Sequence, residues 1–215
     1  MERAVEAGTS APRARLRAFA ILLALNQAAV ALGRVSFPAY RNASGIRDLG
    51  HALVPSLLEL FGERTAEYVW WLGTLPLELF FLAIALSVLF TGRGFRLALC
   101  LYGMYTLHWL FLHATTLPPP DHIVWRFPPG VFTLGKPYED DLWFSGHSAN
   151  AFVIALATRG QAAGLQAIAW FGVAFEILLV LSARAHYTID VLGGLFIAYS
   201  VHRLSLDAFA TGSGT

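Results

Sequence analysis

The chain has 215 residues, of which 56% are hydrophobic and 13% are charged. A soluble domain carries about 25% charged residues, so this composition excludes an ordinary soluble protein and favours an integral membrane protein. The net charge of +1 and the lack of a long basic run argue against a nucleic-acid partner. The single cysteine, Cys100, excludes an intramolecular disulfide.

Six apolar segments are long enough, or nearly long enough, to cross a membrane, because a spanning helix needs about 20 residues. They cover residues 16–33, 68–90, 95–117, 145–157, 162–182 and 187–204. The first follows several arginines, and we interpret it as a retained signal-anchor helix because further spans come after it. The fourth is short, and we expect its start to be buried among the other helices.

Polar connections separate these segments and define the domain organisation. Residues 34–67 carry mixed charges, and an interfacial helix is expected within residues 51–61. Proline disfavours helix between the third and fourth spans, where it occupies positions 118, 119, 120, 128, 129 and 137. The expected organisation is a cytoplasmic segment (residues 1–15), one six-helix membrane catalytic domain (residues 16–205) and a disordered tail (residues 206–215).

Basic residues in short loops predict the orientation, because they are enriched on the cytoplasmic side. If the spans alternate, one side receives Arg3, Arg13, Arg15, Arg17, Arg93, Arg96, Arg159 and Arg203. Exceptions on the other side are Arg34, Arg41, Arg47 and Arg64. We therefore expect both termini in the cytoplasm, and the loop before residue 145 and the turn around Arg184 on the periplasmic, exoplasmic or luminal side.

Two segments place polar residues where an outward-facing loop enters a predicted helix. They are DLWFSGHSAN at residues 141–150 and SARAHYTIDV at residues 182–191. His186 and Asp190 are four residues apart, which places them on one helix face. The carboxylate can hold one imidazole nitrogen protonated and leave the other available as a nucleophile.

The first segment supplies the complementary groups for phosphoryl chemistry. His147 follows Gly146, which allows a ligand to approach closely, and the amide groups of a helix start bind phosphate. His147 is the expected general acid, and Arg184 is expected to neutralise charge on the transferred group. The candidate catalytic residues are His147, His186 and Asp190, and the candidate substrate-binding residues are Asp141, Ser145, Gly146 and Arg184.

Other polar and aromatic residues have simpler interpretations. A lone histidine at a helix end usually packs at the membrane interface, but an aspartate within a span, such as Asp190, is costly and usually functional. His108 and His113 are five residues apart and not on one face, which disfavours a metal pair. The roles of His108, His113, Glu78 and Glu176 stay open between a headgroup pocket and packing inside the bundle. An interfacial aromatic belt is expected from Trp70, Trp71, Trp109, Trp125 and Trp143.

The two motifs, FSGHS at residues 144–148 and HYTID at residues 186–190, resemble those of the sphingomyelin synthase family within the type 2 phosphatidic acid phosphatase superfamily. The similarity covers about residues 45–205, and TTLPPP at residues 115–120 resembles a string that the family carries after its third span. Asp141 matches the acidic residue of the family's third motif, and Asp48 weakly resembles its first.

This resemblance implies an all-α bundle of six membrane helices with an outward-facing catalytic site and no metal or other cofactor. It assigns His186 as the nucleophile, Asp190 as its orienting partner and His147 as the acid. The chain departs from the family at His108, where the family has arginine, and its paired arginines are reduced to Arg93 and Arg96. The phosphatase branch's Lys-x6-Arg-Pro motif is missing, and that branch's Ser-Arg pair is displaced to Ser182 and Arg184, so headgroup and acceptor do not transfer.

The resulting hypothesis is a membrane lipid phosphotransferase that moves a phosphoryl or phospho-headgroup unit from a phospholipid to ceramide or diacylglycerol. With water as acceptor, the same residues would make a lipid phosphate phosphatase or a phospholipase C-type hydrolase. A membrane transporter or binding protein that lost the activity is the competing non-enzymatic hypothesis. Oligomeric state, organelle and donor headgroup are not specified by these patterns.

Overall fold

The computed structural model describes residues 12–33, 46, 48–115, 117–124 and 142–211. Within these residues the regular secondary structure is helical. The helices are α2 (Pro12–Gly33), α3 (Leu49–Leu53), α4 (Leu57–Phe61), α5 (Glu63–Thr91), α6 (Phe95–Ala114), α7 (Gly146–Ala157), α8 (Ala163–Ser182) and α9 (Thr188–Thr211). The expectation of an all-α fold is confirmed for the described residues.

Among the described residues, four helices are long and apolar enough to cross a membrane, which supports an integral membrane protein. They are α5, α6, α8 and α9, whose candidate spans are Glu63–Thr91, Phe95–Leu112, Ala163–Ser182 and Thr188–Phe209. The other two predicted spans correspond to α2 and to α7, which has 12 residues. A helix of that length covers about 18 Å, less than the hydrocarbon core of a bilayer. Six complete spans therefore stay a prediction.

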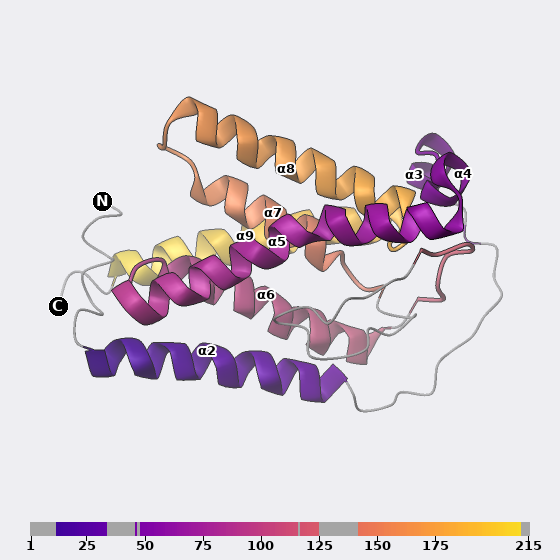
Figure 1. Cartoon of the computed structure of the whole chain (residues 1–215). Coiled ribbons are helices and arrows are strands. Elements are labelled where there is room, and N and C mark those ends of the chain that lie inside the picture. Colours follow the sequence, from indigo (N-terminus) through magenta and orange to yellow (C-terminus); the bar gives the residue numbers. More distant parts are fainter. Residues whose placement is uncertain (1–11, 34–45, 47, 116, 125–141, 212–215) are drawn as a thin grey trace.

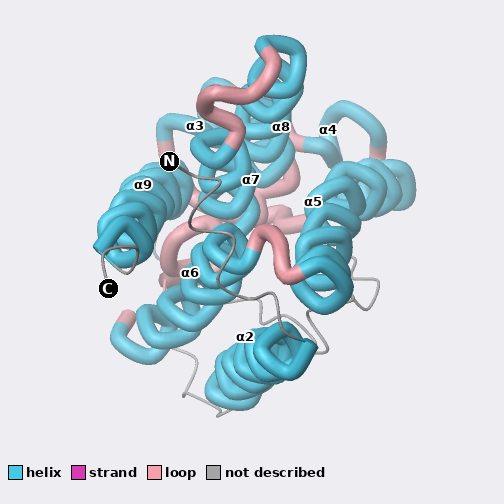
Figure 2. The backbone as a smooth tube through the Cα atoms, turned by 90° about the vertical axis from the view of Figure 1, so that its left-hand side faces the viewer, coloured by secondary structure: helices cyan, strands magenta, loops and turns pink. Residues whose placement is uncertain are grey.

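The long helices lie side by side along one axis and alternate in direction (Figure 1). The end of α8 and the starts of α5, α7 and α9 lie at the end of the bundle that carries α3 and α4, whereas the start of α2 and the end of α9 lie at the other. Viewed along the bundle, α7 occupies the middle, with α5, α6, α8 and α9 around it (Figure 2). This arrangement explains how a 12-residue helix fits: α7 is covered by longer helices.

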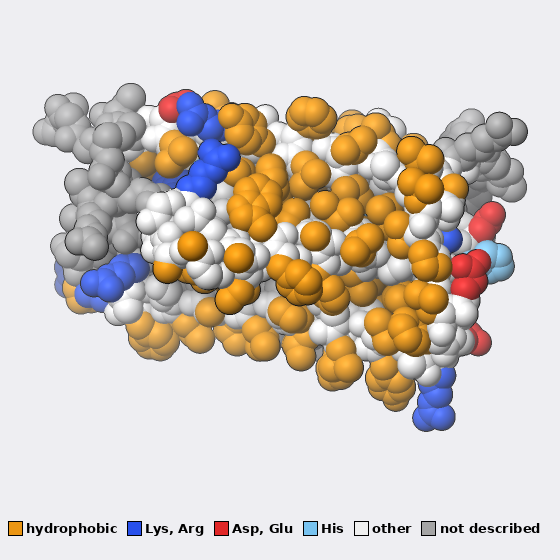
Figure 3. Space-filling view, turned by 90° about the horizontal axis from the view of Figure 1, so that it is seen from above, with side chains coloured by type: hydrophobic (Ala, Val, Ile, Leu, Met, Phe, Trp, Pro, Cys, Tyr) orange, Lys and Arg blue, Asp and Glu red, His pale blue; other side chains and the backbone are white. Residues whose placement is uncertain are grey.

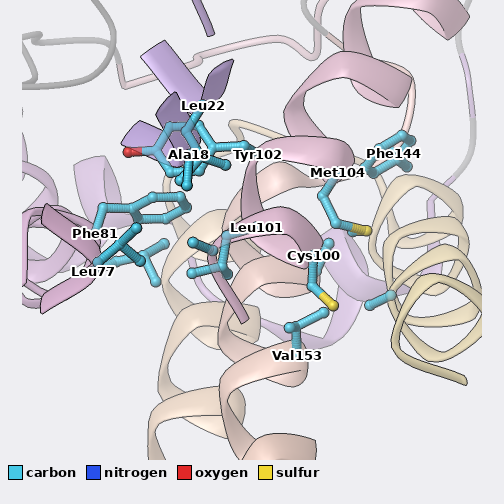
Figure 4. Close-up of a cluster of buried hydrophobic side chains, with 14 residues drawn as sticks. Ala18, Leu22, Leu77, Phe81, Cys100, Leu101, Tyr102, Met104, Phe144 and Val153 are labelled. Atoms are coloured by element: carbon cyan, nitrogen blue, oxygen red, sulfur yellow. The ribbon is translucent and has the colours of Figure 1, made fainter. Parts of the chain in front are cut away.

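Small residues let neighbouring helices approach α7 closely. Ala149, Val153 and Ala155 are completely buried on it. Side chains from α2, α5, α6 and α7 meet in one apolar cluster, in which Leu22 and Phe81 are almost fully buried (Figure 4). Because lipid tails are as apolar as these side chains, close packing rather than escape from water stabilises such contacts in a membrane.

The outer surface has the polarity expected of a membrane bundle. Seen from above, hydrophobic side chains cover most of the middle of the molecule, and charged side chains gather at its two ends (Figure 3). Large exposed apolar side chains on the long helices include Ile168, Phe171 and Phe196, each at least 70% exposed. The described arginines of the predicted cytoplasmic set lie on the end segments opposite α3, but the side of the membrane stays a prediction.

Several predicted boundaries change in the structure. The interfacial helix expected within residues 51–61 is two short helices, α3 and α4, because Pro55 disfavours helix at the residue before it. A capping box between Ser56 and Glu59 starts α4. Helix α9 continues to Thr211, so residues 206–211 are not a disordered tail: no helix breaker occurs before residue 212. Helix α2 similarly begins within the expected N-terminal segment, at Pro12.

Candidate active site

The starts of α7 and α9 meet at the end of the bundle that carries α3. The backbone N–H of Ser145, which precedes α7, donates to the carbonyl oxygen of Asp190 over 2.8 Å. One turn further along α9, a Cβ atom at Gly194 would lie 2.7 Å from the carbonyl oxygen of Ser145. Glycine at this position therefore permits the close approach that brings the two motifs together.

His186 and Asp190 form a buried pair at the start of α9. The imidazole Nδ1 of His186 lies 3.7 Å from Oδ2 of Asp190, and the two residues are 5% and 0% exposed. The same Oδ2 accepts the backbone N–H of Tyr187 over 2.9 Å, which fixes the carboxylate against the helix start. His186 Nδ1 has no hydrogen-bond partner among the described residues, so a small ring rotation toward Asp190 would complete the pair.

His147 is the second residue of α7 and is half-buried. Its ring lies 5.4 Å, centroid to centroid, from that of Trp70 on α5, at an interplanar angle of 51°. Trp70 is only 1% exposed, so the expectation that it belongs to an interfacial belt is wrong. Its place in the sequence, near the start of a span, is typical of a belt residue, but packing of α5 against the site buries it.

Ser145 and Gly146 build the start of α7 in different ways. The Ser145 hydroxyl accepts the backbone N–H of Ser148 over 3.3 Å and donates to the Ser148 hydroxyl over 3.1 Å. Ser145 is fully buried, so its observed contribution is the N-cap, and direct substrate binding stays a prediction. A Cβ at Gly146 would meet no atom of the described residues within 4 Å, so the space beside this glycine is open.

Phe144, the first residue of the FSGHS motif, and Arg184, two residues before the HYTID motif, have left-handed backbone conformations. The φ angle is +56° at Arg184 and +36° at Phe144, values that residues other than glycine, asparagine and aspartate rarely adopt. Arg184 is half-buried, and its Nη1 atom has no hydrogen-bond partner among the described residues. The guanidinium thus retains an unused donor two residues before His186.

The remaining candidates have different positions. Asp141 lies outside the described residues, as does the side chain of His113. His108 is buried on α6, with its ring 5.0 Å from that of Phe144 in an edge-to-face contact, so it packs beneath the site. Glu176 is buried in α8, and Glu78 is half-buried in α5. No three His, Cys, Asp or Glu residues in the described part of the chain form a group that could hold a metal ion.

The structure adds Asp48, His51 and Thr188 to the site. Asp48 accepts the backbone N–H of Thr188 over 2.7 Å and its hydroxyl over 2.8 Å. Nε2 of His51 lies 2.9 Å from the carbonyl oxygen of His186. The weak match of Asp48 to a family motif and its position before a short helix were the available signals, while nothing in the sequence pairs His51 with His186.

The carboxyl of Asp48 is held in its charged form. Burial alone would raise its pKa, but hydrogen bonds from the backbone of His51, the hydroxyl of Thr188 and the backbone of Thr188 outweigh that effect. The net result is a pKa below the ordinary value for aspartate. The contact between α3 and the start of α9 is therefore made by charge-assisted hydrogen bonds.

The loop after α6 covers the same end. The Tyr187 hydroxyl donates to the carbonyl oxygen of Pro118 over 3.0 Å, and the Val124 N–H donates to the carbonyl oxygen of Ala183 over 2.8 Å. Burial, with nearby aspartates, raises the pKa of Tyr187 to about 12, so the phenol stays protonated and able to donate. The described part of the proline-rich loop is thereby attached to the HYTID segment.

Comparison with known proteins identifies the part of the chain that contains both motifs. Residues 140–206 match the family model described as PAP2 superfamily C-terminal. No curated protein and no solved structure matches the chain. The match spans the loop end before α7 and continues into α9, so it includes His147, His186 and Asp190 in one unit. This similarity, over part of the chain, supports a relationship to the type 2 phosphatidic acid phosphatase superfamily, and the site is compatible with lipid phosphatase or phosphotransferase activity.

Proposed function

We propose that this chain is a membrane lipid phosphotransferase of the sphingomyelin synthase type. It moves a phosphoryl or phospho-headgroup unit from a phospholipid to a lipid alcohol, ceramide or diacylglycerol, through a covalent adduct on His186. The observation that carries the proposal is the buried His186–Asp190 pair, tied through the Ser145–Asp190 backbone hydrogen bond to the helix start that bears His147.

In the first step, Nε2 of His186 attacks the phosphorus atom of the donor. A bond forms between nitrogen and phosphorus, and the bond between phosphorus and the diacylglycerol oxygen breaks. Asp190 holds the proton of Nδ1, so that the lone pair of Nε2 is available and the imidazolium that develops is stabilised. His147 donates a proton to the leaving oxygen, and diacylglycerol departs as a neutral alcohol.

In the second step, the roles reverse. Neutral His147 removes the proton from an acceptor hydroxyl, whose oxygen attacks phosphorus. The nitrogen–phosphorus bond breaks, and the electron pair returns to His186. Such a covalent route divides one difficult displacement into two easier ones, which is the advantage of a nucleophilic side chain.

Arg184 and Gly146 suit the charge and size of a phosphate group. The unused Nη1 donor of Arg184 is available for the phosphate oxygens, which carry increased negative charge in the transition state. The open space at Gly146 lies beside the first turn of α7, where amide groups and the helix dipole favour an anion. Strain at Arg184 is consistent with a side chain retained for this use rather than for stability.

Water as the acceptor would convert the same mechanism into a phosphatase or phospholipase C-type hydrolase. We favour a lipid alcohol because HYTID at residues 186–190 is the most specific element of the resemblance. The basic segments at the opposite end favour an exoplasmic, periplasmic or luminal site, because basic residues are enriched on the cytoplasmic side. A reporter that is active only in the cytoplasm should accordingly be active when it is fused after Thr215.

The decisive experiment follows the phosphorus atom. Purified protein in detergent or nanodiscs is incubated with phospholipids labelled in the phosphate, with and without ceramide or diacylglycerol. A labelled lipid that forms only with added acceptor identifies transfer, and labelled water-soluble phosphate or headgroup identifies hydrolysis. Rapid quenching should trap label on the protein in an adduct that is stable to base and labile to acid, as a nitrogen–phosphorus bond is.

Matched histidine variants test the assignment. His186→Ala should abolish both turnover and the adduct, and His147→Ala should slow turnover by about 10²- to 10⁴-fold. His122→Asn is the control, because His122 is exposed at the same end and asparagine tolerates its φ angle of +61°. Turnover that survives His186→Ala would exclude the mechanism, and a wild type that binds or moves lipids without turnover would support the transporter hypothesis.

A further inference from the structure

We propose that the segment from Asp48 to His51 is a clamp that holds the His186 turn in its reactive geometry, with Asp48 and His51 as positioning residues. This inference rests on the proposed function, because it assigns a role in presenting the nucleophile. Neither residue reaches the phosphorus in the proposed mechanism. Both act through the backbone on either side of Tyr187.

The first half of the clamp is Asp48. Its carboxylate receives three hydrogen bonds: from the backbone N–H of Thr188 (2.7 Å), the hydroxyl of Thr188 (2.8 Å) and the backbone N–H of His51 (2.9 Å). The aspartate therefore caps α3 and holds the start of α9 with one side chain. A change in the position of α3 is transmitted directly to the residue two places after the nucleophile.

The second half of the clamp is His51. A carbonyl oxygen only accepts hydrogen bonds, so the contact with the His186 oxygen requires the proton of His51 on Nε2. The ring of His51 also lies 5.4 Å from that of Tyr187, centroid to centroid. These contacts hold the peptide group that joins His186 to Tyr187.

The clamp is closely packed against the turn that contains His186, which leaves that turn little freedom to move. The Gly50 N–H donates to the Thr188 hydroxyl over 2.8 Å, and a Cβ atom at Gly50 would collide with that hydroxyl and approach Leu181. The turn it holds contains the left-handed Arg184 and the His186–Asp190 pair, whose 3.7 Å separation is longer than a hydrogen bond. A displacement of about 1 Å at a reacting group can cost 10²-fold in rate.

Two conservative–disruptive pairs test the clamp. His51→Gln retains an N–H donor near the position of Nε2, and His51→Leu removes it. Thr188→Ser retains the hydroxyl, and Thr188→Val removes it at nearly constant volume. Ala52→Ser is the control, because Ala52 is exposed on the same short helix and the substitution leaves its backbone hydrogen bond to Asp48 in place. Activity is measured on phospholipid in nanodiscs, together with the unfolding midpoint of each variant.

The expected result is a fall in kcat of about 10- to 100-fold for His51→Leu and Thr188→Val, with KM changed by less than about twofold. His51→Gln and Thr188→Ser should recover most of kcat, and Ala52→Ser should match wild type. A folded His51→Leu and Thr188→Val with wild-type kcat would overturn the clamp and leave the proposed function intact. If both members of each pair failed to fold, the segment would serve stability alone, and the clamp proposal would also be overturned.

A wild type that turns over no phospholipid, with or without an acceptor, would instead overturn the proposed function and the clamp that depends on it. The two failures are therefore distinguished by the wild-type assay. If all four clamp variants lost kcat to the same extent and also raised KM, the site would be generally disrupted. That result would also contradict the positioning role.

Discussion

The two ends of the bundle are constructed differently. At the end opposite α3, the turns use glycine for left-handed conformations, with φ angles of +72°, +77° and +81° at Gly92, Gly94 and Gly160. At the α3 end, Gly62 also has a positive φ (+73°), but Arg184 and Phe144 adopt such conformations with full side chains. Glycine accepts these angles without steric cost, whereas other residues are destabilised by about 1–2 kcal/mol.

Their hydrogen bonds differ in the same way. At the opposite end many are local, such as the Arg93 N–H to the Thr91 hydroxyl, although Arg15 reaches Phe90 and Arg96 reaches Ser205. At the α3 end they join distant segments, such as Thr188 with Asp48 and Tyr187 with Pro118. The turns at the end opposite α3 use glycine and avoid backbone strain. The α3 end holds strained residues in place through long-range contacts. Such over-determined strain is typical of functional sites.

The largest contrast should appear along α9, which has an aspartate near each end. Asp190→Asn should lower kcat by about 10²- to 10⁴-fold, because the amide would donate toward His186 and favour the wrong tautomer. Asp207→Asn, at the exposed far end of the helix, should leave kcat unchanged. Steady-state assays of both variants check this. Equal activity of the two variants would show that the α3 end of α9 has no special role in catalysis.

Glycine packing provides the next contrast. Gly194→Ala should destabilise the protein by about 1–3 kcal/mol, because the new Cβ would lie 2.7 Å from the Ser145 carbonyl oxygen. Gly172→Ala should be neutral or stabilising by up to about 1 kcal/mol, since its Cβ would meet no described atom within 4 Å. Unfolding in detergent measures both. A stable Gly194→Ala variant with full activity would contradict the close contact between α7 and α9.

Strain at Arg184 predicts a trade between stability and activity. Arg184→Gly should stabilise the fold by on the order of 0.5–1 kcal/mol, because relief of strain exceeds the entropic cost of glycine. The same change should reduce kcat/KM by about 10- to 100-fold through loss of the guanidinium. Gly160→Ala, at φ +81° in the opposite end, should be destabilising without loss of activity. Destabilisation by Arg184→Gly would show that the side chain serves the fold.

The smallest effect is expected in the acid stability of the α3 contact. The folded-state pKa of Asp48 is depressed, so its stabilising contribution is complete above the unfolded pKa of about 4 and is lost as pH falls through the lower folded value. Unfolding midpoints of wild type should therefore fall more steeply on acidification below about pH 4 than those of Asp48→Asn. Parallel pH profiles for the two proteins would contradict the charged clamp.

Local patterns determined most of the fold. The six helices α2 and α5–α9 correspond to the six apolar segments, although α9 extends past its segment to Thr211, because helix length and apolar composition are local properties of the chain. The spacing of four residues correctly brought His186 and Asp190 together, but the expected shared helix face was wrong, because His186 lies in the turn before α9 and only Asp190 is in the helix. The break in the interfacial helix at Pro55 was also encoded locally, although it was not predicted.

Only the tertiary structure decided which residues surround the reactive pair. The hydrogen bonds from Thr188 to Asp48 join residues 140 positions apart, and the burial of Trp70 against His147 depends on how α5 packs. Such contacts produce no periodic pattern in the sequence, because they follow from the directions in which separate helices approach one another. The chain's own pattern therefore specified a membrane bundle with two imidazoles and a carboxylate at helix starts, while the packing of α3, α7 and α9 determined how closely and in what orientation they are held.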